Sequence, residues 1–186
     1  MLETLVSLDK ELLVYLNNLG TETFDPFWLF ITKQLNWLPF YLVLFYFLIK
    51  QVGWKTVGVI VLLLAFLILC TDQLTNLVKY SVQRLRPCNT EDIKSVLRIV
   101  KSSSSFSFFS GHASNSSATM FFLFLILRRH YKYAYLVFLF PLIFAYSRIY
   151  LSLHFPGDIL VGFMVGVVNG TLCYQLFKWV ERKYHL

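Results

Sequence analysis

Three side chains suited to phosphate chemistry, Arg148, His154 and Asp158, stand close together between two apolar runs. Ionisable groups at membrane depth are costly, so they usually have a task or a partner. Arg148 carries a planar guanidinium that matches phosphate oxygens. Asp158 follows His154 by four residues, so its carboxylate can reach the imidazole, fix the tautomer and raise the basicity of the ring. Together the three side chains predict phosphoryl chemistry.

Two further polar stretches border apolar runs. Lys79 and Arg86 are seven residues apart, so both project from one face if a helix persists to Pro87, which would end it. The same pair also fits two basic residues that snorkel at a membrane edge. Ser110 and Gly111 open the next apolar run, where a hydroxyl and an amide at a helix N-terminus form an anion cradle. A plain serine N-cap gives the same pattern.

The three stretches together resemble the signature of the PAP2 (type 2 phosphatidic acid phosphatase) superfamily. They read Lys-x6-Arg-Pro, then Ser-Gly-His, then Ser-Arg-x5-His-x3-Asp. The resemblance covers roughly residues 57–177, and the three-part signature is highly specific. In the family the second motif usually reads Pro-Ser-Gly-His, whereas this chain has Phe109 at the proline position. That position brings no reacting group.

The resemblance implies a role for each residue of the signature. His154 is implied as the nucleophile that attacks phosphorus, with Asp158 on its other ring nitrogen, through a covalent phosphohistidine that divides one hard displacement into two easier ones. His112 is implied as the general acid for the departing oxygen and then as the base for water. The groups implied to hold the phosphoryl oxygens are Lys79, Arg86, Ser110, the amide of Gly111, and Arg148. The sequence offers no acidic cluster for a metal, so we expect a metal-independent reaction without a cofactor.

The composition is that of a membrane protein. The chain has 186 residues, 57% of them hydrophobic, a mean hydropathy of +0.61, and several apolar runs that approach bilayer-spanning length. We therefore expect a single membrane-embedded domain over residues 1–186. Its fold is expected to be an all-α polytopic bundle of five to six transmembrane helices with an N-terminal amphipathic helix. The same composition excludes the soluble vanadium-dependent haloperoxidases, which share this kind of site.

Charge and cysteine content exclude other classes. The net charge of +7 comes without a basic run or a nucleic-acid motif, so basic loops of a membrane protein explain it and no nucleic-acid partner is expected. The three cysteines, an odd number, include no CxxC pair. They predict neither a disulfide framework nor a cysteine metal site, and they leave the redox compartment open.

The N-terminal segment predicts an amphipathic helix in the membrane interface. Leucines recur there at steps of three and four residues, with charged residues elsewhere; they are Leu5, Leu8, Leu12, Leu16 and Leu19. Asp9, Lys10 and Glu11 interrupt the apolar region that a cleavable signal peptide would need. The PAP2 family usually has six spans, so we interpret this helix as the remnant of the sixth.

The other elements follow from apolar runs. Residues 27–49 fit either one span or a short interfacial helix that ends near Asn36 and is followed by a span. We favour the second reading, because Lys33, Gln34, Asn36 and Pro39 interrupt the run. Further spans are expected at residues 57–78, 110–127, 133–147 and 159–177. Pro156 suits the start of the last helix, whose first turn favours the negative charge of Asp158.

Two features inside the expected spans have alternative explanations. At 1.5 Å per residue along a helix, Asp72 lies about 10 Å deeper in the membrane than Lys79. Its carboxylate could pair with a base of the site. We favour the alternative that it joins a structural hydrogen-bond network with Thr71, Gln73, Asn76 or the polar face 114–117. Glycines also lie four residues apart on one face of the last span, at Gly162, Gly166 and Gly170. They allow close packing, which we assign to contacts inside the bundle rather than to a dimer.

The loops predict the orientation of the site. Basic residues gather opposite the signature residues, in the turns at 50–55 and 128–132 and in the tail from Lys178. The site side holds nine basic residues against eight on the opposite side, but acidic residues nearly cancel its positive charge. The raw count of Lys and Arg therefore does not decide the orientation. Because short loops beside spans carry most weight, we expect the basic turns in the cytoplasm and the site on the periplasmic or extracellular face of the inner or plasma membrane.

The sequence thus predicts a lipid phosphatase acting at the outer leaflet. Our candidates for its substrate are, in order, undecaprenyl diphosphate, phosphatidylglycerol phosphate, phosphatidic acid and a lipid A phosphate. One alternative is a phosphotransferase that passes the phosphoryl group from His154 to a second lipid. Another is a non-enzymatic membrane protein or transporter with a degenerate site, against which the intact His112, His154 and Asp158 argue. The oligomeric state stays open.

Overall fold

The computed structural model describes residues 2–185, and within this range it contains α-helices and 3-10 turns but no β-strand. The α-helices are α1 (Leu2–Asn18), α2 (Asp25–Ile31), α3 (Leu38–Val82), α4 (Glu91–Lys94), α5 (Gly111–Leu127), α6 (Leu139–Tyr150) and α7 (Pro156–Tyr184). The 3-10 turns are η1 (Glu22–Phe24), η2 (Gln34–Trp37), η3 (Pro87–Asn89) and η4 (Ala134–Phe138). The predicted all-α class is confirmed.

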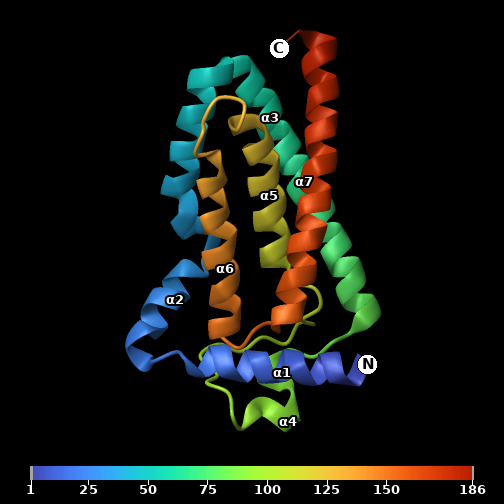
Figure 1. The fold of residues 1–186 in the computed structure, drawn as a ribbon. Helices are drawn as coiled ribbons and strands as arrows, with labels where there is room; N and C mark the ends of the chain where they lie inside the picture. The colour runs from blue at the N-terminus through green and yellow to red at the C-terminus, as the bar shows by residue number, and fades with distance from the viewer. Residues whose placement is uncertain (1, 186) are drawn as a thin grey trace.

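Helix α3 consists of two legs joined at Gly53. This glycine has φ 75° and ψ 168°, outside helical geometry, and L side chains rarely adopt such a φ. A Cβ at this position would meet nothing within 4 Å, so the backbone conformation, and not the available space, favours glycine. Figure 1 shows the chain rising along the first leg, crossing the top of the bundle and descending along the second leg.

Helix α5 lies at the centre of the bundle and contacts α7, α3 and α6. Apolar side chains on several of its faces, including Ala113, Met120 and Phe122, are almost fully buried, as expected of a helix that is hydrophobic all round. Its N-terminal end points towards α1, which lies across the base of the bundle (Figure 1). The residues that begin α5 and α7 are thereby held at the α1 end.

The glycine stripe of α7 packs against α5. A Cβ on Gly162 would lie 2.8 Å from the carbonyl oxygen of Ser110, and one on Gly166 would lie 2.5 Å from that of Ser114. A Cβ on Gly170 would similarly lie 2.7 Å from the carbonyl oxygen of Ala118. Only the absence of a side chain lets the two backbones approach this closely. The assignment of this stripe to contacts inside the bundle is confirmed.

The perpendicular helix α1 is joined to the bundle through a buried asparagine. Asn17 Nδ2 donates to the carbonyl oxygen of Tyr150 at 2.8 Å and to Ser152 Oγ at 3.0 Å, while its Oδ1 accepts from the backbone N–H of Arg98 at 2.8 Å. Buried polar groups need such partners. Asn17 therefore connects α1 with the end of α6 and with the loop that precedes α5.

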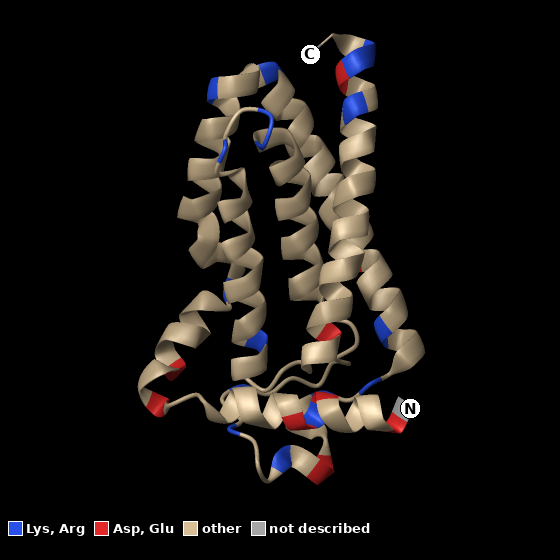
Figure 2. Ribbon diagram, in the orientation of Figure 1, with Lys and Arg blue, Asp and Glu red and all other residues tan. Residues whose placement is uncertain are grey.

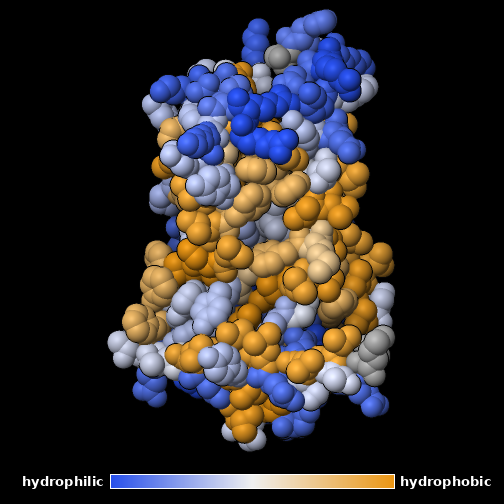
Figure 3. Space-filling view, in the orientation of Figure 1, coloured by the Kyte–Doolittle hydropathy of each residue, from blue (hydrophilic) through white to orange (hydrophobic). Residues whose placement is uncertain are grey.

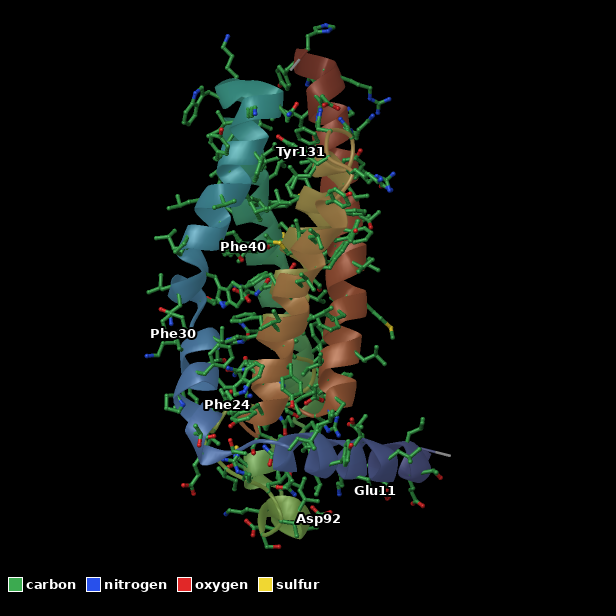
Figure 4. The ribbon with its side chains drawn as sticks, turned by 60° about the vertical axis from the view of Figure 1, so that its left-hand side comes forward. Glu11, Phe24, Phe30, Phe40, Asp92 and Tyr131 are labelled. Atoms are coloured by element: carbon green, nitrogen blue, oxygen red, sulfur yellow. The ribbon has the colours of Figure 1, made fainter. Side chains whose placement is uncertain are left out.

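The charges divide the molecule into two ends. The turns near Gly53 and after α5, together with the end of α7, are basic, and they lie at the end opposite α1 (Figure 2). In Figure 4, Glu11 and Asp92 lie at the α1 end and Tyr131 lies at the opposite end. A broad apolar band separates the two hydrophilic ends on the visible face (Figure 3). Such a band fits a bilayer between two wet surfaces.

Two stretches are long and apolar enough to cross a membrane by length and composition, residues 34–94, which contain α3, and α7. The stretch 134–150 is a shorter apolar helix, and α5 has 17 residues. The expected count of five to six crossings therefore stays a prediction. Within residues 27–49, α2 ends at Ile31 and α3 begins at Leu38, so the reading of a short helix followed by a long one is confirmed.

Candidate active site

His154 lies in the loop between α6 and α7 and is 1% exposed. The carbonyl oxygen of Arg148 accepts hydrogen bonds from the backbone N–H groups of Leu153 (2.9 Å) and His154 (3.3 Å). Ser152, which precedes these two residues, has a left-handed φ of 59°, which lets the chain fold back at the end of α6. This turn presents the imidazole to the interior of the bundle.

The two ring nitrogens of His154 face opposite charges. Nδ1 lies 3.4 Å from Asp158 Oδ2, and Nε2 lies 3.1 Å from Arg86 Nη1. Burial, followed by the positive charges of Arg86, Arg148 and Lys79, lowers the pKa of His154 well below 6.5. The ring is therefore neutral, and a proton on Nδ1 facing the carboxylate leaves the lone pair on Nε2. This is the form in which an imidazole acts as a nucleophile.

Asp158 is fully buried in the first turn of α7. Its Oδ2 accepts a hydrogen bond from the backbone N–H of Phe155 at 3.0 Å, the contact of a capping carboxylate. Its Oδ1 accepts one from Arg84 Nη1 at 2.7 Å. The carboxylate that faces His154 is thus held by a helix start and by an arginine, which fixes its direction.

The predicted phosphate-binding arginines are both buried. Arg86 donates from Nη1 to the carbonyl oxygen of Leu153 at 2.7 Å, and from Nε and Nη2 to the carbonyl and hydroxyl oxygens of Ser105, both at 2.9 Å. Arg148 donates from Nη1 to Thr32 Oγ1 at 2.7 Å, while its buried Nε finds no partner among the described residues. An unpaired buried donor is costly, and an anion at this position would satisfy it.

The predicted helical relation between Lys79 and Arg86 is wrong. Helix α3 ends at Val82, because Gln83 adopts a left-handed conformation with φ 53°, and Arg86 lies in extended backbone before η3. Pro87 starts that 3-10 turn and does not end the helix. Lys79 and Arg86 nevertheless lie close enough for their charges to act on His154.

The Ser110-Gly111-His112 motif opens α5 as predicted. Ser110 is the N-cap, with its Oγ accepting from the backbone N–H of Ala113 at 3.4 Å. Its backbone N–H donates to the carbonyl oxygen of Asp158 at 3.0 Å, which links the starts of α5 and α7. The amide of Gly111 belongs to the first helical turn, whose N–H groups lack helical partners. His112 lies within electrostatic reach of Arg148 and His154.

The sequence reasoning missed two charged residues behind Asp158. Arg84 bridges Asp158 and Asp9, with its Nη2 at 2.7 Å from Asp9 Oδ2, and its guanidinium lies 3.8 Å from the ring centroid of Phe155. Asp9 Oδ1 also accepts from the backbone N–H of Gly157 at 2.7 Å. Arg84 stands inside the Lys-x6-Arg stretch, but no local pattern marks Asp9, which comes from α1.

Asp72 joins the structural network that we favoured. It accepts a hydrogen bond from Asn115 Nδ2, and Asn115 belongs to the polar face of α5. Neighbouring contacts continue the network, with Thr75 Oγ1 3.3 Å from Ser114 Oγ and Asn169 Nδ2 donating to Thr71 Oγ1 at 3.1 Å. The alternative pairing of Asp72 with a base of the site is not seen among residues 2–185.

Known proteins match this chain over most of its length. The model of the PAP2 superfamily matches residues 58–182. The chain is 34% identical to a lipid A 4'-phosphatase of Bacteroides thetaiotaomicron over 178 residues, which cover 94% of this chain and 79% of that protein. It is 25% identical to a lipid A 4'-phosphatase of Porphyromonas gingivalis over 186 residues, which cover 98% of this chain and 78% of that protein.

Solved structures show the same fold. A transmembrane PAP2-type phosphatidylglycerolphosphate phosphatase from Bacillus subtilis superposes with a TM-score of 0.70 at 21% identity, covering 97% of this chain and 87% of that one. LpxE from Aquifex aeolicus superposes with a TM-score of 0.64 at 24% identity, covering 89% and 93%. The motifs, the family match over most of the chain and the shared fold lead to one conclusion: this chain belongs to the PAP2 superfamily of membrane phosphatases.

Proposed function

We propose that this phosphatase removes a phosphate monoester from a glycolipid of the lipid A type. The observation that carries the phosphatase chemistry is His154, held between the carboxylate of Asp158 and the guanidinium of Arg86. The two lipid A 4'-phosphatases each align over more than three quarters of their length. They move a lipid A phosphate from last to first among the candidate substrates.

The first chemical step is the transfer of the phosphoryl group to His154. The lone pair on Nε2 attacks phosphorus, a nitrogen–phosphorus bond forms, and the bond from phosphorus to the lipid oxygen breaks. Asp158 faces the Nδ1 proton and stabilises the positive charge that develops on the ring. His112 gives its proton to the departing oxygen, so the lipid leaves as an alcohol.

The second step returns the enzyme to its starting state. His112, now neutral, takes a proton from a water molecule, whose oxygen attacks the phosphorus of phosphohistidine. The nitrogen–phosphorus bond breaks and inorganic phosphate leaves, which restores the Nε2 lone pair of His154. If a second lipid occupied the place of water, the same step would make the protein a phosphotransferase, and a phosphorylated lipid acceptor would appear in place of free phosphate.

The negative charge of the transferring phosphoryl group is stabilised by the surrounding cations and hydrogen-bond donors. Lys79, Arg86 and Arg148 supply three positive charges, and the hydroxyl of Ser110 and the amide of Gly111 supply further donors. Preorganised donors of this kind stabilise charge most where water is excluded, and Arg86 and Arg148 are only 4% and 6% exposed. The unpaired Nε of Arg148 gives the phosphoryl group a direct partner.

The test is phosphate release by purified protein in detergent. The panel contains lipid A, undecaprenyl diphosphate, phosphatidylglycerol phosphate and phosphatidic acid, and mass spectrometry identifies which phosphate of lipid A is lost. We expect the highest kcat/KM on lipid A, with loss of a single phosphate from the 4' position. Turnover of another member of the panel at a higher kcat/KM than lipid A would overturn the substrate, and release from none of them would overturn the activity.

A further inference from the structure

A cavity of about 260 Å³ opens between α3, α5 and α6, next to the candidate active site. Its walls combine aromatic rings with hydrogen-bonding groups, and they include Asp72, Asn115, Ser116, Thr119 and Phe144. No lysine or arginine of the described part of the chain lines it. The cavity is therefore distinct from the cationic phosphate site, and its chemistry suits an uncharged or donor-rich group.

The cavity begins about one helical turn from His112. His112, Asn115, Ser116 and Thr119 are spaced three and four residues apart on α5, which places them on one face of the helix. One turn corresponds to about 5 Å. Phe144 belongs to both places, since it lines the cavity and its ring centroid lies 5.2 Å from that of His112. A group on the His112 side of the phosphate therefore lies next to this cavity.

The proposed reaction puts the lipid on that side. In phosphoryl transfer the attacking and leaving atoms stand roughly in line on opposite faces of phosphorus. With His154 attacking from one face, the leaving oxygen lies on the other, where His112 protonates it. The part of the lipid bonded to that oxygen therefore extends past His112 towards Phe144 and Asn115.

Two side chains of the cavity, Asn115 and Asp72, offer hydrogen-bond acceptors to a ligand. Asn115 Nδ2 donates to Asp72 Oδ1, which fixes the amide and turns its Oδ1 the other way. That oxygen is buried and has no partner among the described residues. An unsatisfied buried acceptor costs free energy that a ligand donor would recover. Asp72 adds a carboxylate, which accepts strongly and donates nothing when ionised.

We propose that this cavity is the leaving-group subsite and that it takes an acylated amino sugar, whose amide N–H and hydroxyl groups donate to Asn115 and Asp72. This inference rests on the proposed function and names the part of the substrate that sets specificity. An undecaprenyl chain and the diacylglycerol of phosphatidic acid carry no N–H or O–H group next to the phosphate. Both would leave the buried Oδ1 of Asn115 unpaired, a strong basis for discrimination between substrates.

The kinetic test compares two substrates that share the phosphate site. Asn115→Leu should lower kcat/KM for lipid A by about tenfold to a hundredfold, the cost of one or two lost hydrogen bonds in a half-buried site. Its loss for phosphatidic acid should be smaller, under about threefold. Asp72→Asn, which keeps the side-chain shape, provides a second variant in case the leucine variant does not fold. Thermal unfolding of each purified variant is measured beside the kinetics.

The matched control is Asn169→Leu. Asn169 also makes a hydrogen bond within the bundle, to Thr71 Oγ1 at 3.1 Å, but it does not line the cavity. It should leave the ratio of the two kcat/KM values unchanged. Equal losses on both substrates for Asn115→Leu and Asp72→Asn, or unchanged values for both, would overturn the subsite.

A binding measurement separates this inference from the proposed function. Dephosphorylated lipid A, the expected product, should raise the melting temperature of the wild-type protein and of Asn169→Leu but not of Asn115→Leu. If the wild type binds this glycolipid yet releases phosphate from no lipid, the subsite stands and the proposed function fails. If the wild type hydrolyses lipid A but Asn115→Leu binds the product as tightly as the wild type does, the subsite is overturned.

Discussion

At the scale of single residues, His154 supplies the nucleophile of the proposed reaction. Its Nε2 is the atom that would form the bond to phosphorus, so His154→Ala should lower phosphate release at least a thousandfold, since an apolar side chain cannot form the phosphoenzyme. The matched control is His130→Ala, which alters an exposed histidine at the opposite end of the bundle. Retained activity above a thousandth of the wild-type rate would contradict the assignment of the nucleophile.

Arg148 is expected to act through the geometry of its guanidinium as well as through its positive charge. Its Nη1 donates to Thr32 Oγ1, while Nε has no partner within residues 2–185, so the guanidinium is fixed in place with a donor left for the phosphate. Arg148→Lys keeps the charge but loses this geometry, and we expect kcat/KM to fall by about a hundredfold or more. Arg129→Lys, in the turn at the other end, should change kcat/KM less than twofold. A loss under threefold for Arg148→Lys would show that charge alone suffices.

The same cations predict that the reaction needs no divalent metal. Lys79, Arg86 and Arg148 take over the role of neutralising the phosphoryl group, so phosphate release should persist in excess EDTA. Within residues 2–185 no group of three or more His, Cys, Asp or Glu side chains could hold a metal ion, but only the assay tests the prediction. Loss of activity on chelation, restored by Mg²⁺, would mean that the cationic site has been misread.

The motif residues could be predicted from sequence because each has a local signal. Asp158 follows His154 by four residues, and Ser110 precedes an apolar run, so short-range rules suffice for both. The contact between Asp9 and Arg84 joins residues 75 apart, and such a pair leaves no trace in local spacing. The helical relation of Lys79 and Arg86 failed because the left-handed conformation of Gln83 ends α3 early, and no glycine marks that position.

At the scale of elements, α1 supports the site through two contacts of the Asp9 carboxylate. Asp9 holds Arg84 behind Asp158 and also accepts the N–H of Gly157 at the start of α7. Arg84 in turn fixes the carboxylate that faces His154. We therefore predict that Asp9 is a positioning residue, although its side chain lies on a different helix from every motif residue.

Asp9→Ala should lower kcat by about tenfold with little change in KM, because a displaced carboxylate misorients the nucleophile without touching the substrate. Asp92→Ala is the matched control, since it removes the ion pair between Lys10 of the same helix and α4, on the side away from the bundle. Asp9→Glu should restore part of the loss. A rise in KM alone, or equal losses for Asp9→Ala and Asp92→Ala, would show that α1 acts only as a structural support.

The ends of a helix could be predicted from the sequence where a particular residue type marks them. Ser110 and Pro156 mark the starts of α5 and α7, and the polar residues between 33 and 39 correctly divided α2 from α3. Helix α4 was not predicted because it is only four residues long and depends on contacts with its surroundings. Short helices have little intrinsic stability, so their sequences carry a weak signal.

At the scale of the whole molecule, the two ends differ in charge and in chemistry. The basic turns and the end of α7 lie opposite α1 and the site (Figure 2), as the counting of spans had predicted. Short basic loops beside apolar spans favour the cytoplasmic side, so we predict that the site faces outward.

Labelling of single cysteines tests this orientation in intact cells or protoplasts. Two exposed positions serve as probes, Ser104 in the loop at the site end and Tyr133, which is 60% exposed, after α5. In a background without the native cysteines, Ser104→Cys should react with an impermeant maleimide before lysis. Tyr133→Cys, which keeps every positive charge of its turn, should react only after lysis.

The labelling result also limits the possible substrates. A charged headgroup crosses a bilayer slowly because its transfer into hydrocarbon is unfavourable, so the site can act only on lipids of the leaflet that it faces. Labelling of Ser104→Cys before lysis would leave lipids of the outer leaflet as substrates. The reverse pattern, with Tyr133→Cys reacting first, would place His154 on the cytoplasmic side. Lipid phosphates exposed only on the outer leaflet would then be excluded.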